Sequence, residues 1–472
     1  MRVAFVVPEI APFSQTGGLA DVAASLPAAL GALGAEVISF SPLYRSVRRF
    51  SPPRLPLRFR IPLGSSWLEG GVARSGPHYF IEQDSLYDRE GLYGNSRGDF
   101  PDNAARFIFF CRGVLEVLRS GEVPDVIHVH DWPGGLIPVY LRTLYAELHP
   151  RVGTVFTVHN LAYQGLFPAS DMALTGLPPG LFHWRALEFY GRLNFLKAGL
   201  IYADAVTTVS PTYAREIRTE AGGCGLHGVL HERGEAIRGI LNGVDGSTWD
   251  PVRDPNLVAG YSAGALAGKA ACKAALQRRC GLPVRSRIPL AGLVGRLAEQ
   301  KGIGLFLRAA EDLVSEGLQI VVLGSGEERF EEALRRLEAR HRGRVSVFLA
   351  FDPVRAHQVM AGCDLLLVPS LYEPCGLGPM HGLRYGTVPV VRATGGLADS
   401  VEDGVTGFAF RDYTVEAFLG AVRRALAAYG DPDRWRRMIR AGMSRDFGWE
   451  APAREYLQVY AGLKRRQGRP GS

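Results

Sequence analysis

Short apolar runs recur along the chain, and helical patterns separate them. In the first half these runs lie at 2–8, 36–42, 125–130, 154–160 and 205–210. Their residues are apolar on both faces, which is typical of parallel strands covered by helices on each side.

The second half repeats this rhythm after a change in composition. Apolar runs return at 288–297, 319–326, 345–351, 364–370 and 388–394, and the stretch before them, 242–262, is rich in Gly, Asp, Pro and Asn. That composition predicts a linker. We therefore expect an α/β fold of two tandem Rossmann-like, doubly wound domains, with a ligand in the cleft between them. The expected bounds are 1–241 and 263–446, with a last segment at 447–472.

Composition narrows the class of protein. Of 472 residues, 47% are apolar and 21% charged, and the net charge is +7. Much of the positive excess lies in the last turns and on predicted surface helices, without interleaved aromatic residues, so we expect no nucleic-acid partner. The N-terminal apolar run is too short for a signal peptide, and no run approaches the ~20 apolar residues of a membrane span. Six cysteines without a C-x-x-C pair predict reduced thiols in the cytoplasm.

The hexapeptide TGGLAD occurs twice, at 16–21 and 394–399. Each copy follows a predicted strand and opens a predicted helix. A glycine pair lets the backbone approach a ligand closely, and a helix N-terminus favours an anion. Two copies in two domains indicate a shared anionic ligand, although a tight turn explains each copy alone. Neither copy fits the dinucleotide or P-loop fingerprint, so a dehydrogenase or an ATPase is not indicated.

Charged and polar side chains follow several of the predicted strands. Arg296 and Lys301 come after the run at 288–297 and suit a phosphate group, with a surface pair as the alternative. Two clusters in the first half hold His128, His130, Asp131, His159 and Asn160. A zinc site is the alternative there, but the spacing matches no common signature, and a hydroxyl-rich ligand fits better. Cys375 has no base nearby in sequence, so we expect it to pack against a helix start rather than act as a nucleophile.

These residues belong to stretches that resemble one family along nearly the whole chain. TGGLADV, DNAARFIFF, HVHDW, TVHNLAYQG, LNGVD, VGRLAEQKG, EPCGLG, GLRYGTVPVV and the second TGGLADSV match, in order and spacing, the bacterial glycogen synthases and plant starch synthases. The resemblance implies the GT-B architecture, a final helix that returns to the first domain, and no metal or cofactor. It also implies ADP-glucose as donor, an α-1,4-glucan such as glycogen as acceptor, and retention of the anomeric configuration.

The same resemblance implies roles for individual residues. It assigns catalytic roles to Arg296, Lys301, Glu373, His159 and Asp131. It assigns substrate binding to Gln15, Gly17, Gly18, Asp21, Asn160, Asn242, Phe351, Cys375, Gly376, Leu377, Thr394, Gly395 and Gly396. Among these, Phe351 stands where the family usually has an adenine-stacking tyrosine.

Three motifs depart from the family pattern. Gln15 replaces a lysine before the first TGGL, Pro133 replaces a histidine after HDW, and Gly378 with Pro379 replaces a threonine and a glutamine after EPCGL. These changes leave two alternatives to the ADP-glucose reaction. One is a related glycosyltransferase with another donor or acceptor, and the other is a weakly active homologue that binds glucan or nucleotide.

Overall fold

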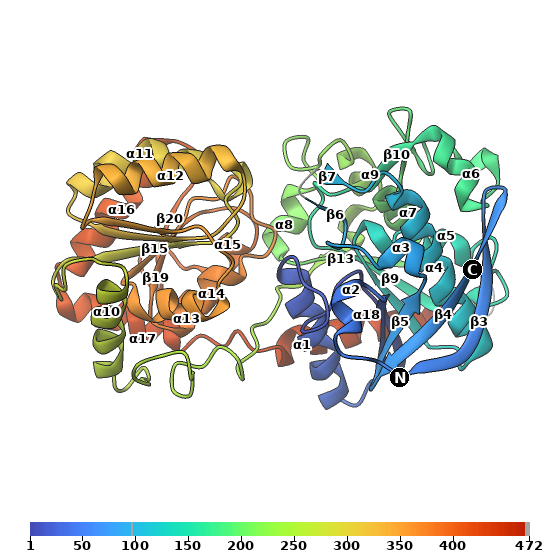
Figure 1. The fold of residues 1–472 in the computed structure, drawn as a ribbon, viewed down its shortest axis with the longest axis horizontal. Coiled ribbons are helices and arrows are strands. Elements are labelled where there is room, and N and C mark those ends of the chain that lie inside the picture. The colour runs from blue at the N-terminus through green and yellow to red at the C-terminus, as the bar shows by residue number, and fades with distance from the viewer. Residues whose placement is uncertain (96–97, 468–472) are drawn as a thin grey trace. The chain divides into compact units, whose positions relative to one another are not determined.

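The computed structural model describes residues 1–95 and 98–467, and the chain forms two compact α/β units (Figure 1). The first unit contains Met1–Val209, Ala214–Gly243 and the chain from Trp449 onward. The second contains Ser210–Tyr213 and Val244–Gly448. The expected α/β fold with two parallel-stranded sheets is confirmed.

A nine-stranded sheet forms the centre of the first unit, in the order β14-β13-β9-β8-β1-β2-β5-β4-β3. Neighbouring strands from β14 to β5 are parallel, and β4 and β3 continue the sheet antiparallel. All five apolar runs predicted in the first half form strands here. Chain order reverses between β1 and β8, so a topological switch point lies at their carboxyl ends. The strands are β1 (Arg2–Val6), β2 (Glu36–Pro42), β3 (Arg54–Leu63), β4 (Ser66–Ser75), β5 (His78–Glu82), β8 (Val126–His130), β9 (Gly153–Val158), β13 (Ala205–Thr208) and β14 (Ile237–Gly239).

The helices of the first unit include the last helix of the chain. Helix α18 packs against α1 and β9, and the Tyr460 hydroxyl lies 2.7 Å from Nδ1 of His128. The bounds are α1 (Gly18–Ala32), α2 (Arg45–Arg48), α3 (Asp84–Tyr87), α4 (Asn103–Ser120), α5 (Ile137–Leu141), α6 (Met172–Thr175), α7 (Phe195–Tyr202), α9 (His227–Glu232) and α18 (Glu450–Gln467). Helix α8 (Pro211–Glu216) begins in the part of the chain assigned to the second unit and ends in the part assigned to the first. Small sheets add β6 (Gly94–Asn95), β7 (Gly98–Asp99), β10 (Leu166–Pro168), β11 (Glu188–Phe189) and β12 (Arg192–Asn194).

The second unit is built on a six-stranded, wholly parallel sheet in the order β17-β16-β15-β18-β19-β20. This is the strand order of a Rossmann fold, with the switch point between β15 and β18. The five predicted runs of the second half are its first five strands. The bounds are β15 (Leu290–Val294), β16 (Gln319–Leu323), β17 (Val345–Phe348), β18 (Leu365–Val368), β19 (Val388–Arg392) and β20 (Phe408–Phe410).

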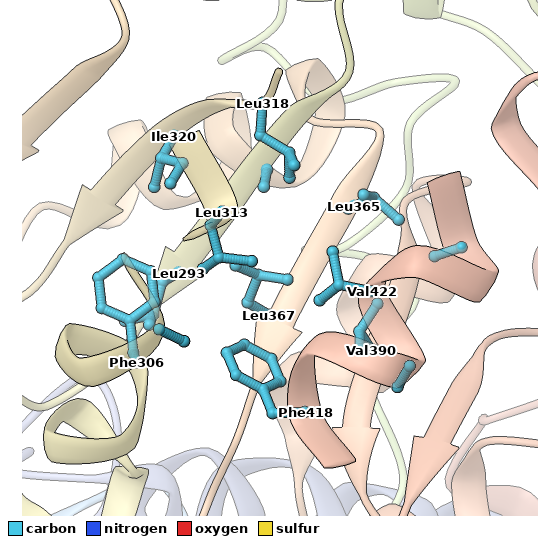
Figure 2. Close-up of a cluster of buried hydrophobic side chains, with 14 of the residues drawn as sticks. Leu293, Phe306, Leu313, Leu318, Ile320, Leu365, Leu367, Val390, Phe418 and Val422 are labelled. Atoms are coloured by element: carbon cyan, nitrogen blue, oxygen red, sulfur yellow. The ribbon is translucent and has the colours of Figure 1, made fainter. Parts of the chain in front are cut away.

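Helices cover both faces of this second sheet. Figure 2 shows the core on one face, where Leu293, Leu365, Leu367 and Val390 of the strands meet Phe306 and Leu313 of α11 and Phe418 and Val422 of α16. The helices are α10 (Ala267–Arg279), α11 (Ile303–Ser315), α12 (Glu328–Arg340), α13 (Pro353–Gly362), α14 (Leu377–Arg384), α15 (Gly395–Ser400), α16 (Val415–Tyr429) and α17 (Pro432–Met443). Burial on both faces explains why these strands are almost wholly apolar, with Gln319, Ser346 and Arg392 as the exceptions.

The polar stretch expected to be a linker is packed against the second unit from Val244 onward. The Asp254 carboxylate accepts a hydrogen bond from the Tyr385 hydroxyl at 2.6 Å and lies 2.6 Å from Nδ1 of His357. The Trp249 ring is stacked between His357 and His381, with centroids 3.8 and 3.9 Å away. Long-range partners therefore order a segment whose composition alone predicts a linker.

Candidate functional site: the strand ends of the two units

An ion pair lies at the switch point of the second unit. Lys301 follows β15 and Glu373 follows β18, and Nζ of Lys301 is 2.9 and 2.7 Å from the two carboxylate oxygens of Glu373. The Ser370 hydroxyl also donates to Oε2 of Glu373 at 3.0 Å. The carboxylate is largely buried, while the lysine side chain is 30% exposed. Its ammonium has three N–H groups and uses two on Glu373, so one is left to face a ligand.

Arg296 lies on the same loop and is exposed. One of its Nη2 hydrogens is donated to Oε1 of Gln300 at 3.0 Å. A planar guanidinium can bind phosphate through two parallel hydrogen bonds.

The second TGGLAD copy packs against the strand end that carries Glu373. Gly395 has φ of +45°, and a Cβ there would lie 2.0 Å from the carbonyl oxygen of Glu373. A Cβ on Gly396 would lie 1.7 Å from the carbonyl oxygen of Cys375. The amide of Gly396 donates to the Glu373 carbonyl at 3.0 Å. Packing within the second unit thus requires both glycines, whether or not a ligand is present.

The first TGGLAD copy has a different environment. Gly17 is exposed and has φ of −157°, and a Cβ built on it would have no atom within 4 Å. Nothing inside the protein therefore requires a glycine there. Gln15 and Asp21 are exposed, and Nε2 of Gln15 donates to Oδ1 of Asp21 at 3.2 Å. Gly18 begins α1, whose first turn has no side-chain cap.

Sequence reasoning missed Glu9, which lies beneath this first loop. Its carboxylate is only 4% exposed and accepts hydrogen bonds from the amide and hydroxyl of Thr16 at 2.5 and 2.9 Å. Burial raises its pKa to about 7. The available signal was an acidic residue three positions after a largely buried strand, because carboxylates are rarely buried without partners.

Asp131 and His159 are brought together in the first unit. Asp131 follows β8 with φ of +55°, and its Oδ1 accepts a hydrogen bond from the His159 amide at 2.7 Å. Nε2 of His159 lies 2.8 Å from Nδ1 of His130. Burial raises the pKa of Asp131 to about 7 and lowers that of His159 to about 3. His159 is therefore neutral near pH 7.

His128 does not fit the ligand role that the sequence predicts for its cluster. The ring is wholly buried, and its two nitrogens lie 2.7 Å from the Tyr460 hydroxyl and 2.6 Å from the Thr157 hydroxyl. Both nitrogens thus have partners inside the core, which makes His128 a structural residue. His130 differs, because its Nε2 is buried without a hydrogen-bond partner among the described residues.

The other predicted site residues have varied surroundings. Phe351 lies beyond the end of β17 and is 79% exposed, so its ring face is available for stacking. Asn160 accepts a hydrogen bond from the Ala162 amide at 3.1 Å. Asn242 is buried, and its Oδ1 has no partner within the described part of the chain. The remaining residues lie near Glu373 in two ways. Cys375 and Gly376 follow it in sequence, and Leu377 begins α14. Thr394 directly precedes the two glycines that pack against the backbone of 373–375.

Two of the departures from the family pattern have clear surroundings. Pro133 is buried, and its carbonyl oxygen lies 3.2 Å from Sγ of Cys111. Gly378 has open space where a side chain would begin.

Over residues 1–95 and 98–467, no group of three or more His, Cys, Asp or Glu side chains is arranged to hold a metal ion. In the same residues, no helix is both long and apolar enough to cross a membrane.

Comparisons with known proteins assign these features to a family. Residues 2–232 match the starch synthase catalytic domain, and residues 282–442 match glycosyl transferases group 1. The chain is 49% identical to a glycogen synthase of Anaeromyxobacter dehalogenans, over 98% of this chain and 100% of that one. It is 46% identical to a glycogen synthase of Syntrophotalea carbinolica, over 98% of each chain.

Solved structures agree with the sequence matches. The catalytic domain of starch synthase IV from Arabidopsis thaliana, bound to ADP and acarbose, superimposes with a TM-score of 0.91 at 34% identity, over 99% of both chains. A sucrose-phosphate synthase from Thermosynechococcus elongatus shares the fold, with a TM-score of 0.63 at 19% identity, over 98% of this chain and 99% of that one. The fold is the GT-B architecture, and these matches show that the chain is a hexosyltransferase. The chain belongs to the glycogen and starch synthase family.

Proposed function

We propose that this protein transfers glucose from ADP-glucose to the 4-hydroxyl at the non-reducing end of an α-1,4-glucan, with retention of configuration, in glycogen biosynthesis. The observation that carries this proposal is the cationic strand end of the second unit. There Lys301 and the carboxylate of Glu373 form an ion pair at a Rossmann switch point, and Arg296 lies on the same loop as Lys301. The relative from Arabidopsis, solved with ADP and acarbose, supports a nucleotide donor and a glucan acceptor.

Each group has a proposed task in the transfer. Arg296 and the remaining N–H of Lys301 bind the diphosphate and stabilise the charge that grows on departing ADP. Glu373 is held by Lys301 and Ser370, and it accepts hydrogen bonds from glucosyl hydroxyls. Thr394, Gly395 and Gly396, with Cys375, Gly376 and Leu377, form the surrounding wall. Phe351 stacks on the adenine.

The first unit supplies the acceptor side in this proposal. Asp131, His159, Asn160 and Asn242 bind glucosyl and acceptor hydroxyls, while Gln15, Gly17, Gly18 and Asp21 form the first loop near the diphosphate. The acceptor 4-hydroxyl attacks the anomeric carbon from the face that ADP leaves, and the departing phosphate takes its proton. Catalysis then depends on positioning and on fixed positive charge.

The six cysteines are free, as expected of a protein kept in a reducing compartment, and we propose that the protein acts in the cytoplasm.

The test of the reaction itself is nucleotide release from ADP-, UDP- and GDP-glucose in the presence of glycogen. Release from ADP-glucose alone, or fastest from it, supports the proposal. Preference for another donor favours the related glycosyltransferase, which the changes at Gln15, Pro133, Gly378 and Pro379 allow. Glycogen binding without release favours the binding homologue.

A further inference from the structure

A buried carboxylate lies directly under the first loop of the proposed donor site. Glu9 accepts hydrogen bonds from the amide and hydroxyl of Thr16 at 2.5 and 2.9 Å, and the Gly17 amide also donates toward it. These donors precede Gly18, where α1 begins. The loop is thus organised around an internal anion, and the uncapped amides that follow it are the ones available to a ligand.

Acidic and phenolic groups and one cation lie around Glu9. Asp21 of α1 and Asp131 at the end of β8 are acidic, and the hydroxyls of Tyr44 and Tyr93 also face this region. The buried guanidinium of Arg106 interacts with both tyrosines. Burial and Asp21 raise the pKa of Glu9, while the hydrogen bonds from Thr16 and Gly17 oppose that rise, and the pKa comes to about 7. A group with this pKa is partly protonated near neutral pH.

We propose that Glu9 is a positioning residue that holds the first TGGLAD loop and takes up a proton from solvent when a diphosphate binds at that loop. The inference rests on the proposed function, because it requires the diphosphate to approach Gly17 and Gly18. A negative charge within about 4–6 Å disfavours the ionised form of a carboxyl group. A diphosphate on one side of the loop therefore shifts Glu9, on the other side, toward its neutral acid. The acid keeps a carbonyl oxygen to accept the Thr16 hydrogen bonds, so the loop stays in place.

Proton uptake can be measured by isothermal titration calorimetry of the protein with ADP-glucose in the absence of glucan. The titration is repeated in buffers that differ in their enthalpy of ionisation. The diphosphate of ADP-glucose is esterified at both ends and has no proton to exchange near pH 7. The slope of the observed heat against buffer enthalpy gives the protons taken up. If the pKa of Glu9 rises by one unit or more, we expect uptake of about 0.4 proton at pH 7, falling toward zero by about pH 10.

Two variants separate the possible outcomes. Glu9→Gln keeps the side-chain size and one acceptor oxygen, and it should lower the uptake by at least half while ADP-glucose still binds. Asp131, whose pKa is also about 7, accounts for any uptake that remains. Gly17→Ala adds a methyl group where the protein has open space, so only a ligand close to the loop would oppose it. We expect it to weaken ADP-glucose binding at least tenfold.

The outcomes for the role of Glu9 differ from the outcomes for ADP-glucose as donor. Absence of ADP-glucose binding to the unmodified protein contradicts the proposed donor. Binding that Gly17→Ala leaves unchanged, or an uptake equal in the unmodified protein and in Glu9→Gln, overturns the role of Glu9 and leaves the donor in place. If Glu9→Gln does not fold, the pH dependence of proton uptake by the unmodified protein tests the role of Glu9. Uptake that does not fall as the pH rises from about 7 to about 10 contradicts a group with pKa near 7.

Discussion

The ammonium of Lys301 bridges both carboxylate oxygens of Glu373, at 2.9 and 2.7 Å, across the switch point of the second unit. One residue follows β15 and the other follows β18, so the pair joins the two neighbouring strands whose ends define the proposed donor site. The lysine thus orients the carboxylate and, in the proposed function, presents charge to a phosphate.

Removal of either cation should slow glucosyl transfer strongly. Lys301→Ala and Arg296→Ala should each lower kcat/KM for ADP-glucose by about 100-fold or more, because each removes fixed positive charge from the transition state. Arg336→Ala, which removes an exposed guanidinium from α12, is the matched control and should keep the full rate. Initial-rate kinetics with saturating glycogen measure the effect. Near-normal rates in both site variants would show that the diphosphate binds elsewhere.

Breaking the Lys301–Glu373 pair should also lower stability, and unequally. Among the described residues, Lys301→Met leaves the Ser370 hydroxyl as the donor to the largely buried Glu373 carboxylate. Glu373→Gln leaves an ammonium on a side chain that is 30% exposed, so water can reach it. We expect Lys301→Met to lower the free energy of unfolding by about 2–3 kcal/mol and Glu373→Gln to lower it by about 1 kcal/mol. Urea unfolding of both variants and of the double variant measures the coupling. Equal losses would contradict the difference in burial.

A lysine at position 15 tests the departure before the first TGGL. Gln15 is exposed and paired with Asp21, so Gln15→Lys adds a charge without disturbing the core. We expect a gain in kcat of less than about tenfold with KM little changed, since charge on the leaving group grows in the transition state. Gln15→Met is the neutral control of similar size. A clear fall in rate for the lysine variant alone would indicate a site rebuilt for another ligand.

The raised pKa of Asp131 predicts a pH-dependent contribution to stability. Its folded pKa of about 7 exceeds the ordinary value of 3.8, so between these values the folded protein binds more protons than the unfolded chain. Stability from this group is full below about pH 4 and is lost as pH rises through about 7. The free energy of unfolding relative to Asp131→Asn should fall by about 2–4 kcal/mol over that window. Urea unfolding at several pH values measures it, and a relative stability that rises with pH would contradict the burial of this carboxyl.

The sequence predicts the strands well because burial on both faces leaves a strong local pattern. The roles of individual buried residues depend instead on contacts between residues that are far apart in sequence. Nothing near His128 in sequence indicates Tyr460 as its partner, so the ring resembles a ligand-binding residue. Likewise, the glycines of the second TGGLAD copy resemble those of the first. Only the approach of the 373–375 backbone distinguishes a packing requirement from an open loop. Glu9 was missed because its role comes from burial and not from a motif.

Retaining transfer from ADP-glucose to the end of an α-1,4-glucan can be followed atom by atom. The measurement uses ADP-glucose labelled with ¹³C at the anomeric carbon, a maltooligosaccharide acceptor and NMR of the product. We expect one new α-1,4-linked glucose at the non-reducing end for each ADP released. A β-linkage, a different position of attachment, or ADP release without a new glycosidic bond would contradict it.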